Sequence, residues 1–391
     1  MPIVPITQFK GLHNKGPSLR LPSGALTVAD NVNVLDTGAI EVRSGYERAT
    51  TMTLSGAFAT EDESRLYVVD SGVLKVVHPD MSSTDLAQVG PGEVLWAQLN
   101  EQVLFATASA SGIIDPDNSV LPWAWDVPAT PMLQAVSGHM DSGQYGVLLV
   151  HMLPDGRTTG AGLEQYIELQ AGQGLHITAP QPPTGIRQLA YVCPANSTVY
   201  QLAGELRAGS LTWDASANAL GRELTKFALD PLPQGVVAIA VWRSRACVAV
   251  PMEQQAQSVV FSSEPMAPHL FDMTEFFMVP GKVTMLAAHP SALLVGTESC
   301  IYAYGADGVL AKLADYGVVP GSPHALDGAR LLFWSKRGVC QFPEFKCLTD
   351  RAVSVAPGVR AGACVVQDNG QSRLVVALQK GGEAHNPRIN R

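Results

Sequence analysis

The sequence predicts an all-β protein: a β-propeller of about five to seven blades with an inserted β-sandwich domain. Three observations lead to this prediction. Short apolar strands, each followed by a turn and a second strand, recur along the chain. Within each half of the chain these units start roughly 40 residues apart, which is the length of a four-stranded blade. Finally, 36 Gly and 27 Pro residues interrupt any long helix and favour strands joined by turns.

The repeating unit is clearest at residues 65–77, where Asp70-Ser71-Gly72 joins two β-rich runs and predicts a hairpin. A four-stranded sheet cannot bury both of its faces alone, so blades must pack around an axis before any of them is stable. A β-sandwich with coincidental strand spacing is the alternative. Comparable pieces occur at residues 102–107, 246–250, 293–304, 330–340 and 373–378.

The spacing of the predicted strands changes between two proline-rich segments, Pro128-Ala129-Thr130-Pro131 and Pro231-Leu232-Pro233. About seven short strands are expected over the roughly 100 residues between them, the size of an immunoglobulin-like or fibronectin-like sandwich. The prolines fit two linkers through which an inserted domain enters and leaves its host. We therefore expect an N-terminal meander and the first blades in 1–130, the inserted sandwich in 131–233, the remaining blades in 234–380 and a C-terminal tail in 381–391.

The composition favours contacts with other proteins. Charged residues make up 16% of the chain, well below the roughly 25% of typical soluble domains, so much of the surface is expected to be uncharged. The formal charge of −9 argues against a broad basic face for a phosphate backbone, and no sequence-specific nucleic-acid partner is predicted. No apolar run approaches the length of a membrane-spanning helix and the first residues lack a signal-peptide pattern, which predicts synthesis in a cytoplasm and no membrane span.

The six cysteines are far apart and include no Cys-x-x-Cys pair, so neither a zinc site nor a redox motif is expected. Most of them stand beside apolar residues, which predicts small buried side chains in the reduced form. They are Cys193, Cys247, Cys300, Cys340, Cys347 and Cys364.

A search for chemistry predicts no catalytic residue, no cofactor site and no metal site, so the chain is not expected to be an enzyme. Nucleophile elbow, Walker, Rossmann and zincin motifs do not occur. His139, His151 and His176 come nearest to a cluster, but without metal-ligand spacing they are expected to be ordinary surface or hydrogen-bonded histidines. Trp123 and Trp125 suit either a carbohydrate-stacking platform or a buried blade strand, and we favour the buried strand.

The N-terminal segment carries a resemblance to a known family. The order of its motifs is similar to the opening of virion proteins of tailed bacteriophages, in particular tail hub, nozzle or tail-tip proteins with a β-propeller body. His13 departs from this pattern, which more often has Asn there. The motifs are Phe9-Lys10-Gly11-Leu12-His13-Asn14, Ala29-Asp30-Asn31-Val32, Asp36-Thr37-Gly38 and Arg43-Ser44-Gly45-Tyr46. The Asp155-Gly156-Arg157 turn resembles the inserted sandwich of such proteins, and residues 316–322 and 335–338 resemble their late blades.

The resemblance implies a structural component of a tailed-phage virion, a tail hub, nozzle or tail-tip (baseplate) protein, that acts by assembly. Its implied partners are other phage tail proteins and further copies of itself, three or six around the tail axis. Its implied location is the tail of the virion, after synthesis in the host cytoplasm. Two alternatives stay open: a carbohydrate-binding or glycan-cleaving propeller at the tail tip, and a non-viral bacterial propeller scaffold.

Overall fold

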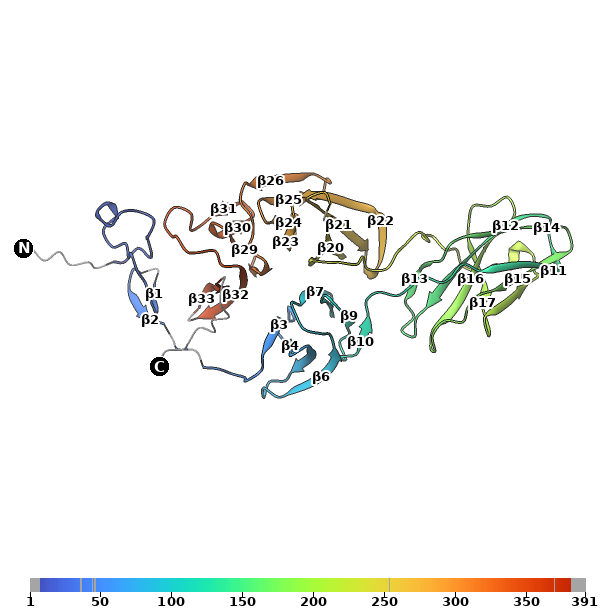
Figure 1. The fold of residues 1–391 in the computed structure, drawn as a ribbon, viewed down its shortest axis with the longest axis horizontal. Helices are drawn as coiled ribbons and strands as arrows, with labels where there is room; N and C mark the ends of the chain where they lie inside the picture. Colours follow the sequence, from blue (N-terminus) through green and yellow to red (C-terminus); the bar gives the residue numbers. More distant parts are fainter. Residues whose placement is uncertain are drawn as a thin grey trace, which may run out of the picture.

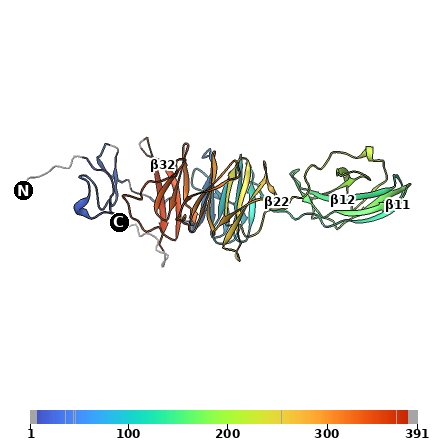
Figure 2. The same cartoon turned by 90° about the horizontal axis from the view of Figure 1, so that it is seen from above.

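A computed structural model describes residues 8–380 except residues 36, 44, 46, 253 and 369. Three parts follow one another along the long axis of the molecule: an N-terminal segment, a propeller and a sandwich (Figures 1 and 2). The described residues contain two short 3-10 helices, Ser18–Arg20 and Ala217–Ala219, and otherwise only strands and loops. The predicted all-β propeller with an inserted sandwich is therefore confirmed. The predicted tail, 381–391, lies outside the described residues.

Five four-stranded antiparallel sheets, which we call blades 1 to 5, form most of the propeller in the described part of the chain. In each blade the strands pair in sequence order, as expected for a meander. Blade 1 has β3 (Leu54–Ala59), β4 (Leu66–Asp70), β5 (Val73–Val77) and β6 (Ser83–Gln88), and blade 2 has β7 (Leu95–Leu99), β8 (Gln102–Ala106), β9 (Ser111–Ile114) and β10 (Val120–Pro122). Blade 3 has β19 (Ala238–Trp242), β20 (Arg245–Met252), β21 (Gln257–Glu264) and β22 (Ala267–Pro280). Blade 4 has β23 (Val283–His289), β24 (Ala292–Thr297), β25 (Ile301–Gly305) and β26 (Leu310–Ala314), and blade 5 has β28 (His324–Asp327), β29 (Arg330–Ser335), β30 (Gly338–Phe342) and β31 (Lys346–Cys347).

The sixth sheet of the propeller is smaller than the others. It consists of β27 (Gly321–Ser322), β32 (Arg360–Asp368) and β33 (Gln371–Gln379). The two-residue strand β27 runs parallel to β32, and β33 pairs antiparallel with β32. Among the described residues no strand pairs with the other edge of β33, so this sheet lacks the outer strands that the five blades have.

Local sequence explains the hairpins. In blade 1, Asp70 pairs with Val73, and the two turn residues Ser71 and Gly72 have φ of 52° and 86°. Positive φ at both central positions is the type I′ geometry that matches the twist of the flanking strands. The predicted hairpin at residues 65–77 is confirmed, and the other five predicted pieces also fall on strands.

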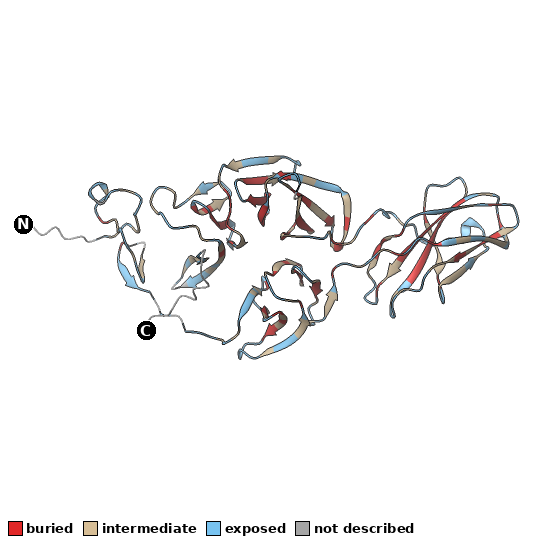
Figure 3. Cartoon of the chain, viewed as in Figure 1, coloured by how far each residue is buried: buried red, intermediate tan, exposed pale blue. Residues whose placement is uncertain are grey.

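The propeller core lies between neighbouring blades, where Figure 3 shows the buried residues. Tyr67 of blade 1 packs with Phe105 of blade 2, and Ile113 of blade 2 packs in one cluster with Val248 of blade 3. Further clusters join blade 3 to blade 4, blade 4 to blade 5, and blade 5 to the sixth sheet. Within the described part of the chain no such cluster joins the sixth sheet back to blade 1.

The sandwich is inserted between blades 2 and 3. One sheet contains β11 (Met132–Met140), β15 (Gln173–Thr178) and β18 (Ser210–Trp213). The other contains β12 (Gly143–Met152), β13 (Thr158–Ala161), β14 (Gln165–Leu169), β16 (Arg187–Cys193) and β17 (Gln201–Glu205). Leu149 and Val192 from this sheet and Leu175 and Ile177 from the first are buried together. The insertion has its own core, so it does not depend on propeller side chains for burial.

The N-terminal segment, residues 8–53, has almost no core. Its only buried residues among those described are Gly24 and Gly38. The strands β1 (Val32–Val34) and β2 (Ile40–Val42) form a hairpin whose turn includes Gly38 at φ 83°, while the predicted turn residue Asp36 lies outside the described residues. Because so little is buried here, the segment depends on contacts with other parts of the molecule or with partners.

Candidate functional site

The histidines that come nearest to a cluster in the sequence are not brought together as a metal site. His139 lies on β11 and His176 on β15, whereas His151 lies on β12 in the other sheet of the sandwich. His176 Nδ1 is 2.9 Å from the hydroxyl of Thr212, and burial lowers the pKa of His151. Among all described residues, no group of three or more His, Cys, Asp or Glu side chains is arranged to hold a metal ion.

The tryptophan pair does not form a carbohydrate platform. Trp123 is fully buried between blades 2 and 3, and its Nε1 donates a hydrogen bond to the carbonyl of Pro268 at 2.6 Å. Trp125 is partly exposed, and its Nε1 donates to the carbonyl of Pro122 at 3.1 Å. Trp123 directly follows β10, close to the favoured prediction of a buried blade strand.

An open groove lies where the propeller ring should close. We call it the seam: it separates β3 of blade 1 from β32 and β33 of the sixth sheet, and its volume is about 1140 Å³. Small residues line much of both sides. They are Ser55, Gly56 and Ala57 on β3, and Gly362, Ala363 and Ala377 on the sixth sheet.

The two walls of the seam are held by polar rather than apolar contacts. Arg360 of β32 forms a salt bridge of 2.5 Å with Glu93, which precedes β7, and both side chains are at least a third exposed. Such an exposed pair contributes at most about 1 kcal/mol. Leu54 at the start of β3 is 43% exposed, and a Cβ added to Gly362 would meet nothing within 4 Å. Apolar side chains therefore fill the space between every other pair of neighbouring sheets, whereas the space between blade 1 and the sixth sheet stays open.

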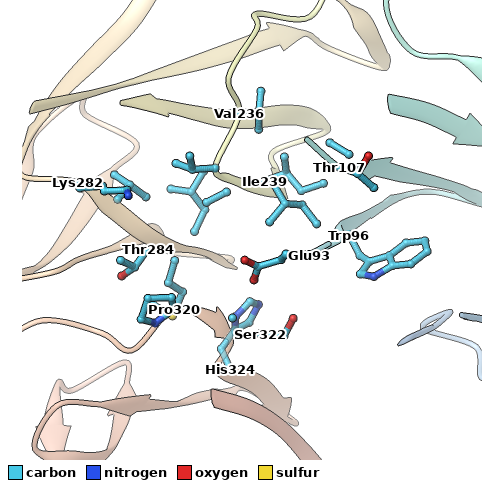
Figure 4. Close-up of a pocket in the computed structure, with 18 of the residues that line it drawn as sticks. Glu93, Trp96, Thr107, Val236, Ile239, Lys282, Thr284, Pro320, Ser322 and His324 are labelled. Atoms are coloured by element: carbon cyan, nitrogen blue, oxygen red, sulfur yellow. The ribbon is translucent and has the colours of Figure 1, made fainter. Parts of the chain in front are cut away.

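A second hollow lies at the propeller axis (Figure 4). This central cavity has a volume of about 330 Å³ and is lined by residues of blades 2, 3, 4 and 5 and of β27. Val236 and Ile239 face Ser322 and His324 across it, and Lys282 lies at one end. The cavity and the seam have Glu93, Trp96, Gly321 and Ser322 in common, so the two spaces adjoin each other.

The polar side chains of the central cavity fall into two groups. The hydroxyls of Thr107 and Thr284 donate to the carbonyls of Val89 at 2.8 Å and Val318 at 3.0 Å. By contrast, Nδ1 of His324 and Nε1 of Trp96 are inaccessible and make no hydrogen bond in the described structure. Burial lowers the pKa of His324 to about 4, so this imidazole is neutral at pH 7. Because both atoms are inaccessible to solvent, they are buried against protein atoms and do not open on the cavity.

Sequence reasoning named some residues that line these two spaces, such as Cys364 and Ser322, but for other reasons, and it did not predict either space. Glu93, Arg360, Gly362 and His324 come from distant parts of the chain and belong to no motif. Glu93 and His324 flank short apolar strands, which is an ordinary position for a polar residue. Only the arrangement of the blades brings them to the seam and the central cavity.

The reactivity of Cys364 can be used to test whether the seam is open. It lines the seam and is exposed, whereas burial raises the pKa of Cys247 to about 11 and of Cys340 to about 12. The thiolate is the reactive form, so we expect iodoacetamide at neutral pH to modify Cys364 at least tenfold faster than either buried cysteine. Peptide mass spectrometry at timed intervals measures the three rates. Equal rates would mean that the blades open on the timescale of labelling.

Comparisons with known proteins give structural likeness only. No protein-family model matches the chain, and no curated protein matches it in sequence. Solved structures similar to the chain include Hsv2p of Kluyveromyces lactis, with 10% identity, coverage of 83% of this chain and 88% of that chain, and a TM-score of 0.32. Apo AztD of Citrobacter koseri has 11% identity, coverage of 88% and 92%, and a TM-score of 0.30. BamB of Moraxella catarrhalis has 11% identity, coverage of 74% and 82%, and a TM-score of 0.27.

Proposed function

We propose that this chain is a structural component of a tailed-phage virion, a tail hub, nozzle or tail-tip protein that acts by protein–protein assembly. The open seam is the observation that carries the proposal. A closed propeller buries both faces of every blade against its neighbours. Here the sixth sheet buries residues against blade 5, while its other side borders the open seam and no strand pairs with the outer edge of β33 in the described structure.

Uncovered strand edges favour a subunit over an isolated monomer. Soluble proteins normally protect such edges, because unpaired backbone groups on an exposed strand pair readily with other chains. Leu54, which lines the seam, is 43% exposed, and Cys364 on the opposite wall is exposed as well. A partner segment that enters the seam would cover these side chains and supply the missing contacts.

The N-terminal segment offers a second surface for assembly. Leu19, Val28 and Val42 are 99%, 66% and 73% exposed, although the segment buries almost nothing of its own. Polar contacts join it to the propeller: Asn14 bonds to Ala352 and Ser354, and Lys15 to Asp350. Glu41 of β2 also forms an ion pair of 4.0 Å with Arg373 of β33. Four of the motifs that resemble phage tail proteins, those between Phe9 and Tyr46, lie in this same segment, which supports a role in contacts between subunits.

The N-terminal segment and the seam are different surfaces of one chain, and this favours a symmetric ring of copies. If the N-terminal segment and the seam contact different partners or copies, the contacts are heterologous, and heterologous contacts close into rings when the rotation permits. Together with the axial symmetry of tails, this leads us to propose three or six copies around the tail axis.

None of the helices in the described residues is long and apolar enough to cross a membrane.

Stoichiometry in purified particles tests the proposal. We expect three or six copies per particle by quantitative mass spectrometry, measured against a major tail protein. A protein missing from the particles would overturn the proposed function, and one copy per particle would overturn the ring.

Labelling inside the particle gives a second readout. Cys364 is expected to react at least tenfold more slowly in particles than in the free protein, because a partner would cover the seam. Cys300, on blade 4 away from the seam, serves as the control whose rate should not change. Unchanged labelling of Cys364 would show that assembly leaves the seam open.

A further inference from the structure

We propose that Cys340 and Cys347 form a site of thiol–disulfide exchange, at which a small-molecule disulfide converts the two thiols into one cross-strand disulfide of blade 5. The two residues lie directly opposite each other on the antiparallel strands β30 and β31. Both are free thiols in this structure. Neither of them lines the seam or the central cavity, so the site is separate from both.

The hydrogen bonds beside the two cysteines show which kind of pair they form. Leu348 N donates to the carbonyl of Val339 at 2.7 Å, so the hydrogen bond lies at the neighbouring pair and Cys340 and Cys347 are a non-hydrogen-bonded pair. Opposite residues of such a pair have Cα atoms about 4.5 Å apart and the closer side chains. A disulfide needs Cα atoms about 4.4–6.8 Å apart. The register therefore suits a bond between the two sulfur atoms.

The surroundings of the two thiols give them different roles. Cys340 is fully buried in the core between blades 4 and 5, and Cys347 packs against the same core but stays partly exposed. Burial raises the pKa of Cys340 to about 12, and the neighbouring thiol of Cys347 adds to this effect. The thiolate is the reactive form, so Cys340 is a poor first nucleophile. A reagent in solution therefore meets Cys347 first.

The exchange has two steps. The Cys347 thiolate attacks one sulfur of the small-molecule disulfide, whose S–S bond breaks and releases one thiolate. The Cys340 sulfur then attacks Sγ of Cys347, displaces the second thiolate and transfers its proton to it. Two cysteine thiols are thereby oxidised to one disulfide, and the reagent is reduced to two thiols. The second step is favoured because Cys340 is held beside Cys347 and does not arrive from solution.

The new bond would fix a part of blade 5 that holds the N-terminal segment. The strand β31 contains only two residues, and Asp350 and Ala352, which contact Lys15 and Asn14, follow it along the chain. Disulfides form in oxidising surroundings and are rare in a cytoplasm. In a virion the pair therefore closes after the particle leaves the cell. This timing rests on the proposed function, whereas formation of the bond does not.

Glutathione tests the site in the purified full chain, as an equimolar mixture of its oxidised and reduced forms. Trypsin cleaves after Arg337 and Lys346, so without reduction a disulfide joins peptide 338–346 to peptide 347–351. By mass spectrometry, the joined peptides should exceed the glutathione adduct of Cys347 at least tenfold, because the second thiol is in place. Cys364 is the internal control: it is exposed but lies opposite Val375, so its adduct should persist. A lasting adduct on Cys347, or an unmodified pair in a chain whose Cys364 has reacted, would overturn the proposal.

Variants separate the two steps. In Cys340→Ser, Cys347 should keep glutathione, because no thiol displaces it. In Cys347→Ser, Cys340 should stay unmodified, and this variant should melt roughly 5 °C below the closed wild-type chain, the shift expected for a short loop closed by a disulfide. Glutathione on Cys340 of Cys347→Ser would contradict the assigned order of attack, and the joined peptides of the wild-type chain decide the proposal even if a variant does not fold. All these measurements use the free chain, so absence of the protein from particles would overturn the proposed function and leave this result unchanged.

Discussion

Replacing Trp123 with alanine is expected to lower the free energy of unfolding of the propeller by about 4 kcal/mol, as is usual for truncating a fully buried tryptophan. Trp123 packs in one cluster with Leu104 and Ile113 of blade 2 and with Phe271 of blade 3. It also donates the 2.6 Å hydrogen bond to the Pro268 carbonyl, which the variant leaves without this donor. The effect is large because this side chain joins two blades that the inserted sandwich separates in sequence.

Urea denaturation of the full chain measures this effect. The sandwich has its own core, so its unfolding transition should stay in place and serve as an internal reference. Trp125→Ala is the matched control: the side chain is partly exposed and bonds only to the nearby Pro122 carbonyl, so a change of about 0.5 kcal/mol or less is expected. Comparable losses in the two variants would mean that the contact between blades 2 and 3 does not depend on Trp123.

The parts of the fold that sequence predicts are those set by local rules. The Asp70-Ser71-Gly72 turn requires positive φ at two successive residues, and the apolar run before it is buried on both faces, at Tyr67, Val68 and Val69. The same rules located one or two strands of every blade, among them β8, β20 and β29. The change of rhythm after Pro131 likewise predicted a second type of β domain, and β11 to β18 run from Met132 to Trp213.

The candidate sites could not be predicted in this way, because they depend on how distant blades meet. Nothing in the strand 371–379 indicates that no further strand pairs with it, since its apolar run 374–378 resembles that of a strand paired on both sides. His324 appears as an ordinary polar residue at the start of a strand until the blades place it on the propeller axis. The burial of Trp123 was favoured from sequence, but its partner Pro268 lies beyond the whole inserted domain.

Replacing Gly362 with tryptophan is expected to reduce incorporation of the protein into particles at least tenfold while leaving the melting temperature within about 2 °C of wild type. A Cβ at this position meets nothing within 4 Å, and tryptophan is well tolerated in strands, so the fold can accept the side chain. The indole would occupy the seam, where the proposed partner segment must enter. A clash with an incoming chain thus affects assembly without affecting folding.

The matched control is Gly362→Ala, which adds the same Cβ but leaves most of the seam free, and which should assemble at wild-type copy number. Both variants are supplied in host cells to phage that lack the wild-type gene, and copy number is measured by quantitative mass spectrometry of the particles. Circular dichroism melts of the purified free proteins verify that both variants are folded. Normal copy numbers of the tryptophan variant would show that assembly does not use the seam, because no partner segment could share that space with an indole anchored on β32.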